Sequence, residues 1–132
     1  MPPPFQSLDH VHVYVANRAT AEVWYQKVLG FARIQKFECW APNDGPLMLG
    51  NESIPFKIAL FERNAEKRHS TIAFAVTGQD FLAWRSHLTA TLDHSPELED
   101  HKLSWSLYFH DPDGNPYEIT SYDYSELRPL LP

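Results

Sequence analysis

The order of predicted elements runs twice through the chain: a strand, a helix and three more strands. Residues 8–15 alternate between two faces, which is typical of a strand with one buried side. Apolar residues then recur at helical spacing until Gly30, which ends the predicted helix. Three further strands complete the first half, and we expect them at 31–40, 47–50 and 56–63.

The second half follows the same order. Residues 70–77 predict a strand, and Asp80 is placed to cap a helix that carries apolar residues. A weak strand is expected within 92–100, and a short closing helix over 125–131. Clear strands are predicted at 103–110 and 117–122. The repeat therefore predicts an α+β fold built from paired βαβββ modules.

A chain of 132 residues is expected to form one domain. We place module one at about 5–63, module two at about 69–122 and a C-terminal tail at 123–132. No linker composition separates the halves, so we expect the modules to share one core.

Polar side chains occupy one face of the predicted strands, and apolar side chains occupy the other. The apolar faces suit contact with one helix per module. If the two sheets curl together, the polar faces line a shared concave cavity. The polar set is His10, His12, Tyr14, Thr71, Ser104, Ser106, Tyr108, Glu118 and Thr120.

The stretch 108–119 predicts a strand, a tight turn and a second strand. Pro112 presets φ for the turn, and Gly114 accepts the positive φ that such a turn requires. Glu118 follows inside a strand that otherwise reads as buried. A carboxylate is costly there unless a positive or protic group meets it, so the sequence predicts a functional site around Glu118.

Composition excludes several classes of partner. The net charge of −6, without a basic run, argues against nucleic acid. No apolar stretch is long enough to predict a membrane span. Cys39 is the single cysteine, so no internal disulfide can form, which fits the reducing cytoplasm. We expect a cytoplasmic protein whose partner is a small molecule.

Three segments, 8–11, 24–31 and 108–118, resemble the vicinal oxygen chelate superfamily. That superfamily groups glyoxalase I, bleomycin-resistance proteins, fosfomycin-resistance thiol transferases and extradiol dioxygenases. The resemblance implies a cupped, barrel-like mixed sheet around a divalent metal, with the helices outside. Because members are commonly dimers, it also implies a homodimer.

The resemblance implies a set of metal ligands. His10 matches the first ligand and Glu118 the last, four residues after the turn glycine. Thr71 stands where the second histidine is usual, and His69 lies two residues earlier. A bulge or strand shift would bring His69 into the site. We expect His10, His69 and Glu118 to bind Fe, Mn, Zn or Ni.

These ligands predict a metal-dependent enzyme that acts on a substrate with adjacent oxygens, dioxygenase-like or thiol-transferase-like in type. His12 shares a face with His10, and is expected to act on the substrate or to bind the metal. Tyr108 matches a substrate-contact position of fosfomycin-type members. Glyoxalase I activity is disfavoured, because apolar residues lie where that enzyme needs a glutamate in module one, near 58–61.

A metal-free reading is the alternative. His10 and His12 would then hydrogen-bond with Glu118 and Tyr108 in a pocket that binds or sequesters a small molecule. Thr71 in place of histidine favours this reading. Three aromatic residues are expected either to wall such a pocket or to join the core: Phe37, Trp40 and Phe56.

Overall fold

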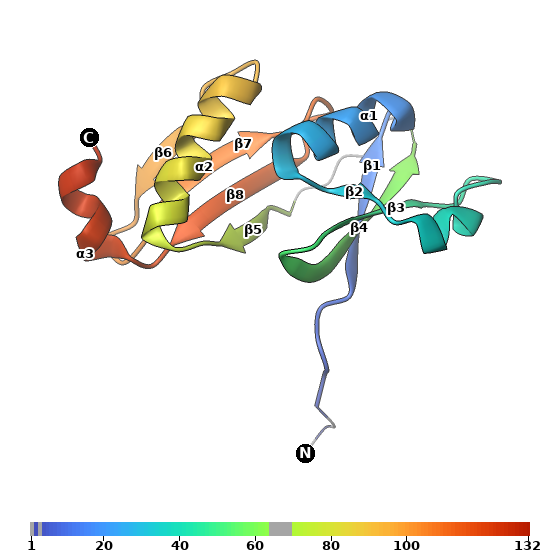
Figure 1. The fold of residues 1–132 in the computed structure, drawn as a ribbon, viewed down its shortest axis with the longest axis horizontal. Coiled ribbons are helices and arrows are strands. Elements are labelled where there is room, and N and C mark those ends of the chain that lie inside the picture. Colours follow the sequence, from blue (N-terminus) through green and yellow to red (C-terminus); the bar gives the residue numbers. More distant parts are fainter. Residues whose placement is uncertain (1, 3, 64–69) are drawn as a thin grey trace. The chain divides into compact units, whose positions relative to one another are not determined.

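The computed structural model describes residues 2, 4–63 and 70–132. The chain divides into two compact units, residues 1–66 and residues 67–132, and each is described by itself. Each unit contains one four-stranded mixed sheet (Figure 1).

The sheet of the first unit has the strand order β1-β4-β3-β2. Strand β1 (His10–Val15) runs parallel to β4 (Ile54–Glu62). Strand β3 (Leu47–Asn51) is antiparallel to β4 and to β2 (Ala32–Arg33). The first strand of the unit therefore lies beside its last strand, which brings residues far apart in sequence into register.

The predicted alternation of β1 is confirmed. Val13 and Val15 are buried, whereas His10 and His12 are exposed on the other face. The helix that follows is α1 (Arg18–Trp24), and it continues as a π-helical turn, η1 (Tyr25–Leu29). Gly30 ends it with a φ of 70°, as the sequence predicted.

The predicted strand over 31–40 is wrong beyond its first residues. Strand β2 stops at Arg33, and a 3₁₀ helix, η2 (Gln35–Trp40), follows. The apolar residues Ile34, Phe37 and Trp40 stand three apart, which is the period of a 3₁₀ helix and not of a strand. This difference moves Phe37 and Trp40 out of the sheet.

The sheet of the second unit has the order β5-β8-β7-β6 and repeats the topology of the first. Strand β5 (Ile72–Ala75) runs parallel to β8 (Pro116–Ser121). Strands β7 (Trp105–His110) and β6 (Glu97–Asp100) add in antiparallel pairs. The α+β class and the paired βαβββ modules are therefore confirmed, whereas the shared core stays a prediction.

The long helix of the second unit is α2 (Gly78–Thr91), which packs on β8 and buries Phe81 and Leu88. Its N-cap is Thr77, not Asp80, because the Thr77 hydroxyl accepts a hydrogen bond from the Asp80 backbone N–H at 3.2 Å. No helix in the part of the chain that the structure describes is long and apolar enough to span a membrane.

The second unit ends in two short helices, α3 (Tyr124–Leu127) and the 3₁₀ helix η3 (Arg128–Leu130). They occupy the stretch where the sequence predicted a closing helix. Leu127 of α3 is buried, and α3 packs against α2. The tail is thus part of the second unit's core.

The turn that joins β7 to β8 has the predicted chemistry. Asp111 is buried, and its Oδ1 accepts hydrogen bonds from the backbone N–H groups of Asp113 and Asn115 at 2.9 and 2.8 Å. Its Oδ2 accepts one from the Asn115 side chain at 2.8 Å. Gly114 has a φ of 85°, which favours glycine. This turn fixes the register that places Glu118.

Candidate functional site

A pocket of about 430 Å³ lies on the exposed face of the first unit's sheet. Strand β1 contributes His10 and His12, two positions apart on one face. The register pairs His10 with Lys57 of β4 and His12 with Ala59. The complete lining is Asp9, His10, His12, Phe37, Trp40, Pro46, Met48, Lys57 and Ala59.

The Asp9 carboxylate connects two of the polar lining residues. Its Oδ1 accepts a hydrogen bond from Lys57 Nζ at 2.9 Å, and its Oδ2 lies 2.7 Å from His10 Nδ1. The hydrogen bond from Lys57, followed by that from His10, holds the pKa of the Asp9 carboxyl below its ordinary value. Asp9 is therefore ionised at neutral pH.

An ionised Asp9 determines the tautomer of His10. A carboxylate only accepts hydrogen bonds, so Nδ1 of His10 must carry the proton. In a neutral imidazole, the lone pair is then on Nε2. A carboxylate behind a histidine is the arrangement that orients metal-bound histidines and raises their basicity. The lone pair on Nε2 of His10 is thus available to coordinate a metal ion or to accept a hydrogen bond.

His12 lies between His10 and an aromatic ring of β4. Its ring centroid is 5.2 Å from that of His10, with the planes 23° apart, and 4.8 Å from that of Phe61. Because Ala59 is small and lies opposite His12 in the register, it leaves space beside the imidazole.

Two aromatic rings line the pocket beside the histidines. Phe37 and Trp40, both on η2, stack with centroids 4.5 Å apart and planes 14° apart. Trp40 keeps 50% of its surface exposed. The alternative in which these residues join the core is therefore wrong for Trp40, while Phe56 is buried and does join it.

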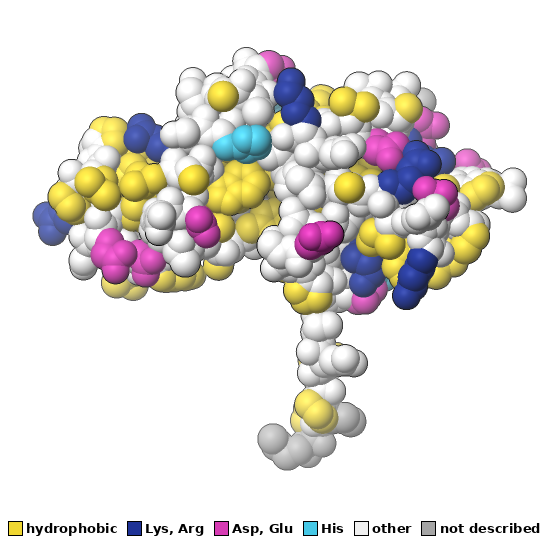
Figure 2. All heavy atoms as spheres, in the orientation of Figure 1, with side chains coloured by type: hydrophobic (Ala, Val, Ile, Leu, Met, Phe, Trp, Pro, Cys, Tyr) yellow, Lys and Arg dark blue, Asp and Glu magenta, His cyan; other side chains and the backbone are white. Residues whose placement is uncertain are grey.

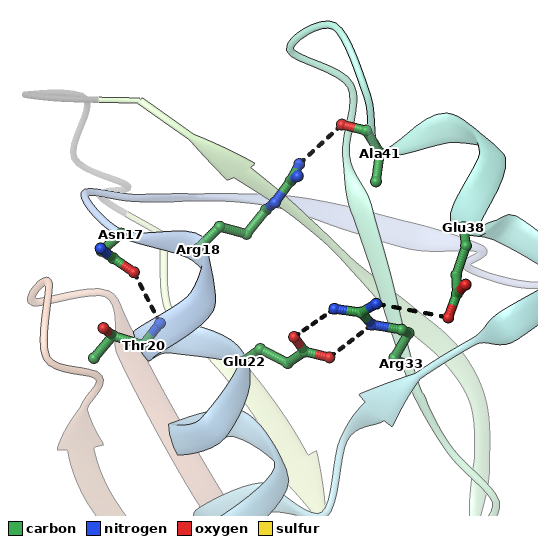
Figure 3. Close-up of polar contacts among 7 residues, drawn as sticks. All are labelled: Asn17, Arg18, Thr20, Glu22, Arg33, Glu38 and Ala41. Carbon is green, nitrogen blue, oxygen red and sulfur yellow. Dashed lines mark hydrogen bonds and ion pairs between the residues drawn. The ribbon is translucent and has the colours of Figure 1, made fainter.

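The segment that carries these rings is held by polar contacts with α1 (Figure 3). Nη1 of Arg18 donates to the carbonyl oxygens of Ala41 at 3.2 Å and Gly45 at 2.8 Å. Arg33 makes a two-pronged ion pair with Glu22, each contact 2.8 Å long, and reaches Glu38 of η2 at 3.7 Å. Side chains of opposite charge also adjoin one another over this unit in Figure 2.

The second unit carries its own polar cluster around Glu118. In the register, Glu118 of β8 lies between Tyr108 of β7 and Ala73 of β5. The Ser106 hydroxyl donates to Glu118 Oε2 at 2.7 Å. The Ser106 hydroxyl thus offsets part of the free-energy cost of burying a carboxylate in this strand.

Tyr108 stands next to this carboxylate. Burial, followed by the negative charge of Glu118, raises the pKa of the Tyr108 phenol. The phenol oxygen also lies 3.0 Å from His101 Nε2. Tyr108 is therefore a protonated hydroxyl at neutral pH, with a histidine beside it.

The sequence model of the Glyoxalase/Bleomycin resistance protein/Dioxygenase superfamily matches residues 7–119. The chain belongs to this superfamily. The match covers both βαβββ modules, so it agrees with the repeat read from the sequence. No curated protein is significantly similar to this superfamily member in sequence.

Solved structures share the fold of this superfamily member at low identity. A putative glyoxalase family protein from Bacillus anthracis has a TM-score of 0.71 at 22% identity, over 93% of this chain and all (100%) of that one. An integron cassette protein from the metagenome of the Halifax Harbour sewage outfall has 0.71 at 22%, over 89% and 99%. The fosfomycin resistance protein FosX from Listeria monocytogenes, complexed with Mn(II) and sulfate, has 0.67 at 15%, over 97% and 100%.

The ligand set expected for this superfamily member is described only in part. His10 lies in the first unit and Glu118 in the second, and His69 lies outside the described residues. Thr71 is exposed just before β5. Among the residues that the structure describes, no three His, Cys, Asp or Glu side chains gather closely enough to hold a metal. His10 fits a metal ligand by its tautomer, and Glu118 by its carboxylate, one oxygen of which accepts from Ser106.

Several residues of the clusters were missed or misplaced by sequence reasoning. Asp9 and Lys57 were not singled out, because their pairing depends on the parallel register of β1 and β4. His101, in the loop before β7, was not singled out either, and its Nε2 lies 3.0 Å from the Tyr108 phenol oxygen. His94 was likewise not singled out, and its ring stacks on that of His110 with the centroids 4.1 Å apart.

Proposed function

We propose that this chain is a metal-dependent enzyme that acts on a small molecule with adjacent oxygens. In this proposal His10, His69 and Glu118 hold a divalent ion, and His12 and Tyr108 act on the substrate. The observation that carries it is the Asp9 carboxylate, 2.7 Å from His10 Nδ1, because this contact leaves Nε2 as the donor atom.

The divalent ion would act as a Lewis acid with open positions for substrate oxygens. The chain's own residues would do the rest. His12, stacked on His10, can accept a proton from the substrate at an imidazole nitrogen. Tyr108 keeps its phenolic proton at neutral pH and can donate a hydrogen bond to a developing negative charge.

Within this function, a dioxygenase-like or thiol-transferase-like reaction is favoured over glyoxalase I. Ala59 lies opposite His12 on the last strand of the first unit, in the stretch where glyoxalase I needs a carboxylate. FosX, which shares the fold, was solved with Mn(II). We therefore propose Mn among the candidate ions, beside Fe, Zn and Ni.

Metal analysis tests the proposal directly. The protein is purified without a histidine tag, soaked in each ion, desalted and analysed for metal content. We expect a stoichiometric ion in the wild type, and its loss in His10→Ala and Glu118→Ala. His87→Ala, on α2, is the matched control and should retain the ion. Wild-type protein that holds no metal after soaking would remove the proposal.

A metal-free binding protein is the second candidate. Two observations favour it: the Lys57 ammonium lies in the same pocket as His10, and Thr71 replaces the usual second histidine. This candidate predicts a melting temperature that a chelator does not change, together with a rise when a ligand is added. A fall in melting temperature on chelation would instead support the enzyme.

We also propose that the protein is a cytoplasmic homodimer that forms one domain over residues 1–132. Over the described residues, the outermost strands of the two sheets are β1 and β2 in one and β5 and β6 in the other. Open edges of this kind favour pairing with a further strand. Light scattering after size exclusion, run at several protein concentrations, would show the dimer mass. A monomer mass at every concentration would contradict it.

A further inference from the structure

We propose that Phe37 and Trp40 form a stacking surface for a flat aromatic ring of the substrate, whose acidic oxygen faces Lys57 and His12. This inference rests on the proposed function in one respect: the pocket beside His10 is where the substrate is held. It names the substrate class, which neither the fold nor the metal ligands decide.

The exposure of Trp40 is the first support. Of the chain's four tryptophans, Trp105 is buried with 4% of its surface exposed, and Trp24 and Trp84 are partly buried, whereas Trp40 is 50% exposed. Phe37 stacks on the indole, so the exposed half of Trp40 is available to another ring. A large aromatic surface left open inside a pocket is typical of ligand sites.

The second support is the rigidity of the stacking surface, the wall of the pocket that Phe37 and Trp40 form. Arg18 of α1 holds the carbonyl oxygens of Ala41 and Gly45 just after η2. Gly45 approaches so closely that a Cβ at this position would clash with the Trp40 carbonyl oxygen. The rings are thus held in place before a ligand arrives, which lowers the entropy cost of binding.

The charges opposite the wall indicate which substituent the ring carries. Both oxygens of Asp9 are already occupied, one by Lys57 and the other by His10. Lys57 donates one of its three ammonium protons to Asp9 in a hydrogen bond, and the Lys57 side chain is only 21% exposed. Lys57 therefore keeps two N–H donors for a ligand at the polar end of the pocket, which favours an acceptor such as a carboxylate or phenolate oxygen.

The size of the pocket limits the ligand further. A volume of about 430 Å³ lies in the range of small-molecule sites. Met48 and Pro46 add apolar surface beside the rings. A one- or two-ring aromatic acid matches both the volume and the division between an apolar wall and a donor-rich end.

The test uses 1-naphthoate as the probe and its fully saturated counterpart, decahydro-1-naphthoate, as the matched control ligand. Both carry the same carboxylate, but only the first has a π face. Affinities are measured by calorimetry, and the contacted residues by amide chemical-shift changes, with chelated and with metal-soaked protein. We expect 1-naphthoate to bind more tightly and to shift amides of η2 and β1. Equal affinities for the two ligands would overturn the inference.

Variants at the wall sharpen the test. Trp40→Ala should weaken 1-naphthoate roughly three- to tenfold, the usual range for one aromatic contact, and Trp40→Phe should keep most of the affinity. Trp84→Ala, in the other unit, is the matched control and should bind as the wild type does. Circular dichroism checks that each variant folds, and Phe37→Leu replaces Trp40→Ala if the latter does not. Wild-type affinity in the folded wall variants would overturn the inference.

A change at the donor end tests the substituent. Lys57→Gln should weaken 1-naphthoate by a larger factor than the neutral analogue 1-naphthamide, because only the carboxylate carries a charge that the ammonium neutralises. Equal loss for both ligands would contradict the part assigned to Lys57. If 1-naphthoate binds through Trp40 although no metal is retained, the inference stands and the metal-dependent function fails. If the metal is retained and the aromatic preference is absent, the reverse holds.

Discussion

Lys57 holds the carboxylate of Asp9 from the neighbouring strand, with Nζ 2.9 Å from Oδ1. The two residues are 48 positions apart in sequence, and the parallel pairing of β1 with β4 brings them together. The contact matters because the other oxygen of the same carboxylate orients His10.

The Asp9 carboxyl should titrate below its ordinary value of 3.8, because ionisation is favoured by Lys57 and His10. Since the folded pKa is lowered, the carboxylate contributes stability above pH 3.8, and this is lost as the pH falls through the folded value. Carbon-detected NMR of the side chain measures the midpoint. Lys57→Met should raise it and Lys27→Met, an exposed control, should not. An unchanged midpoint in Lys57→Met would contradict the pairing.

Gly45→Ala should destabilise the first unit, because the new Cβ would clash with the Trp40 carbonyl oxygen and force the loop away from η2. We expect a loss of about 1–3 kcal/mol in the free energy of unfolding, measured in urea. Gly114→Ala is a contrasting variant: no atom of the described residues lies within 4 Å of a Cβ added at this position, so the cost comes from the positive φ. The Trp40 emission should shift in Gly45→Ala and stay constant in Gly114→Ala.

Asp111→Ala should destabilise the β7–β8 turn, since three N–H donors around the buried carboxylate would lose their acceptor. The expected loss is about 2–4 kcal/mol in the free energy of unfolding. Asp111→Asn retains one oxygen and should lose less. If thermal and urea unfolding of Asp111→Ala match those of the wild type, the turn does not depend on this carboxylate.

Glu118→Gln should lower the pKa of Tyr108 toward its ordinary value of 10.0, because a negative charge that opposes the phenolate is removed. Burial remains in the variant, so the pKa should stay above 10.0. NMR of ring-labelled tyrosine follows the titration. Glu126→Gln, on the exposed side of α3, should leave the value unchanged. Equal Tyr108 values in Glu118→Gln and wild type would show that the two side chains are not neighbours in solution.

Most helices, strands and turns of this fold could be predicted from local sequence patterns. Burial of one face imposes a period of two on β1, so Val13 and Val15 identified the strand before its partners were known. The β7–β8 turn was readable for the same local reason, since Asp111 and Gly114 satisfy it within a few residues. The prediction of a strand over η2 was wrong. This segment, which carries Phe37 and Trp40, packs against the loop at Gly45 and does not pair with a strand.

The candidate site divides in the same way. The sequence by itself determined the repeat of βαβββ modules, the exposed face that carries His10 and His12, and the unusual position of Glu118 in a strand. Only the tertiary structure showed that Asp9 contacts both Lys57 and His10, and that Trp40 lines a pocket with half of its surface exposed. The physical reason is that side-chain periodicity is a local property, whereas a contact across 48 residues exists only once strand register has been set.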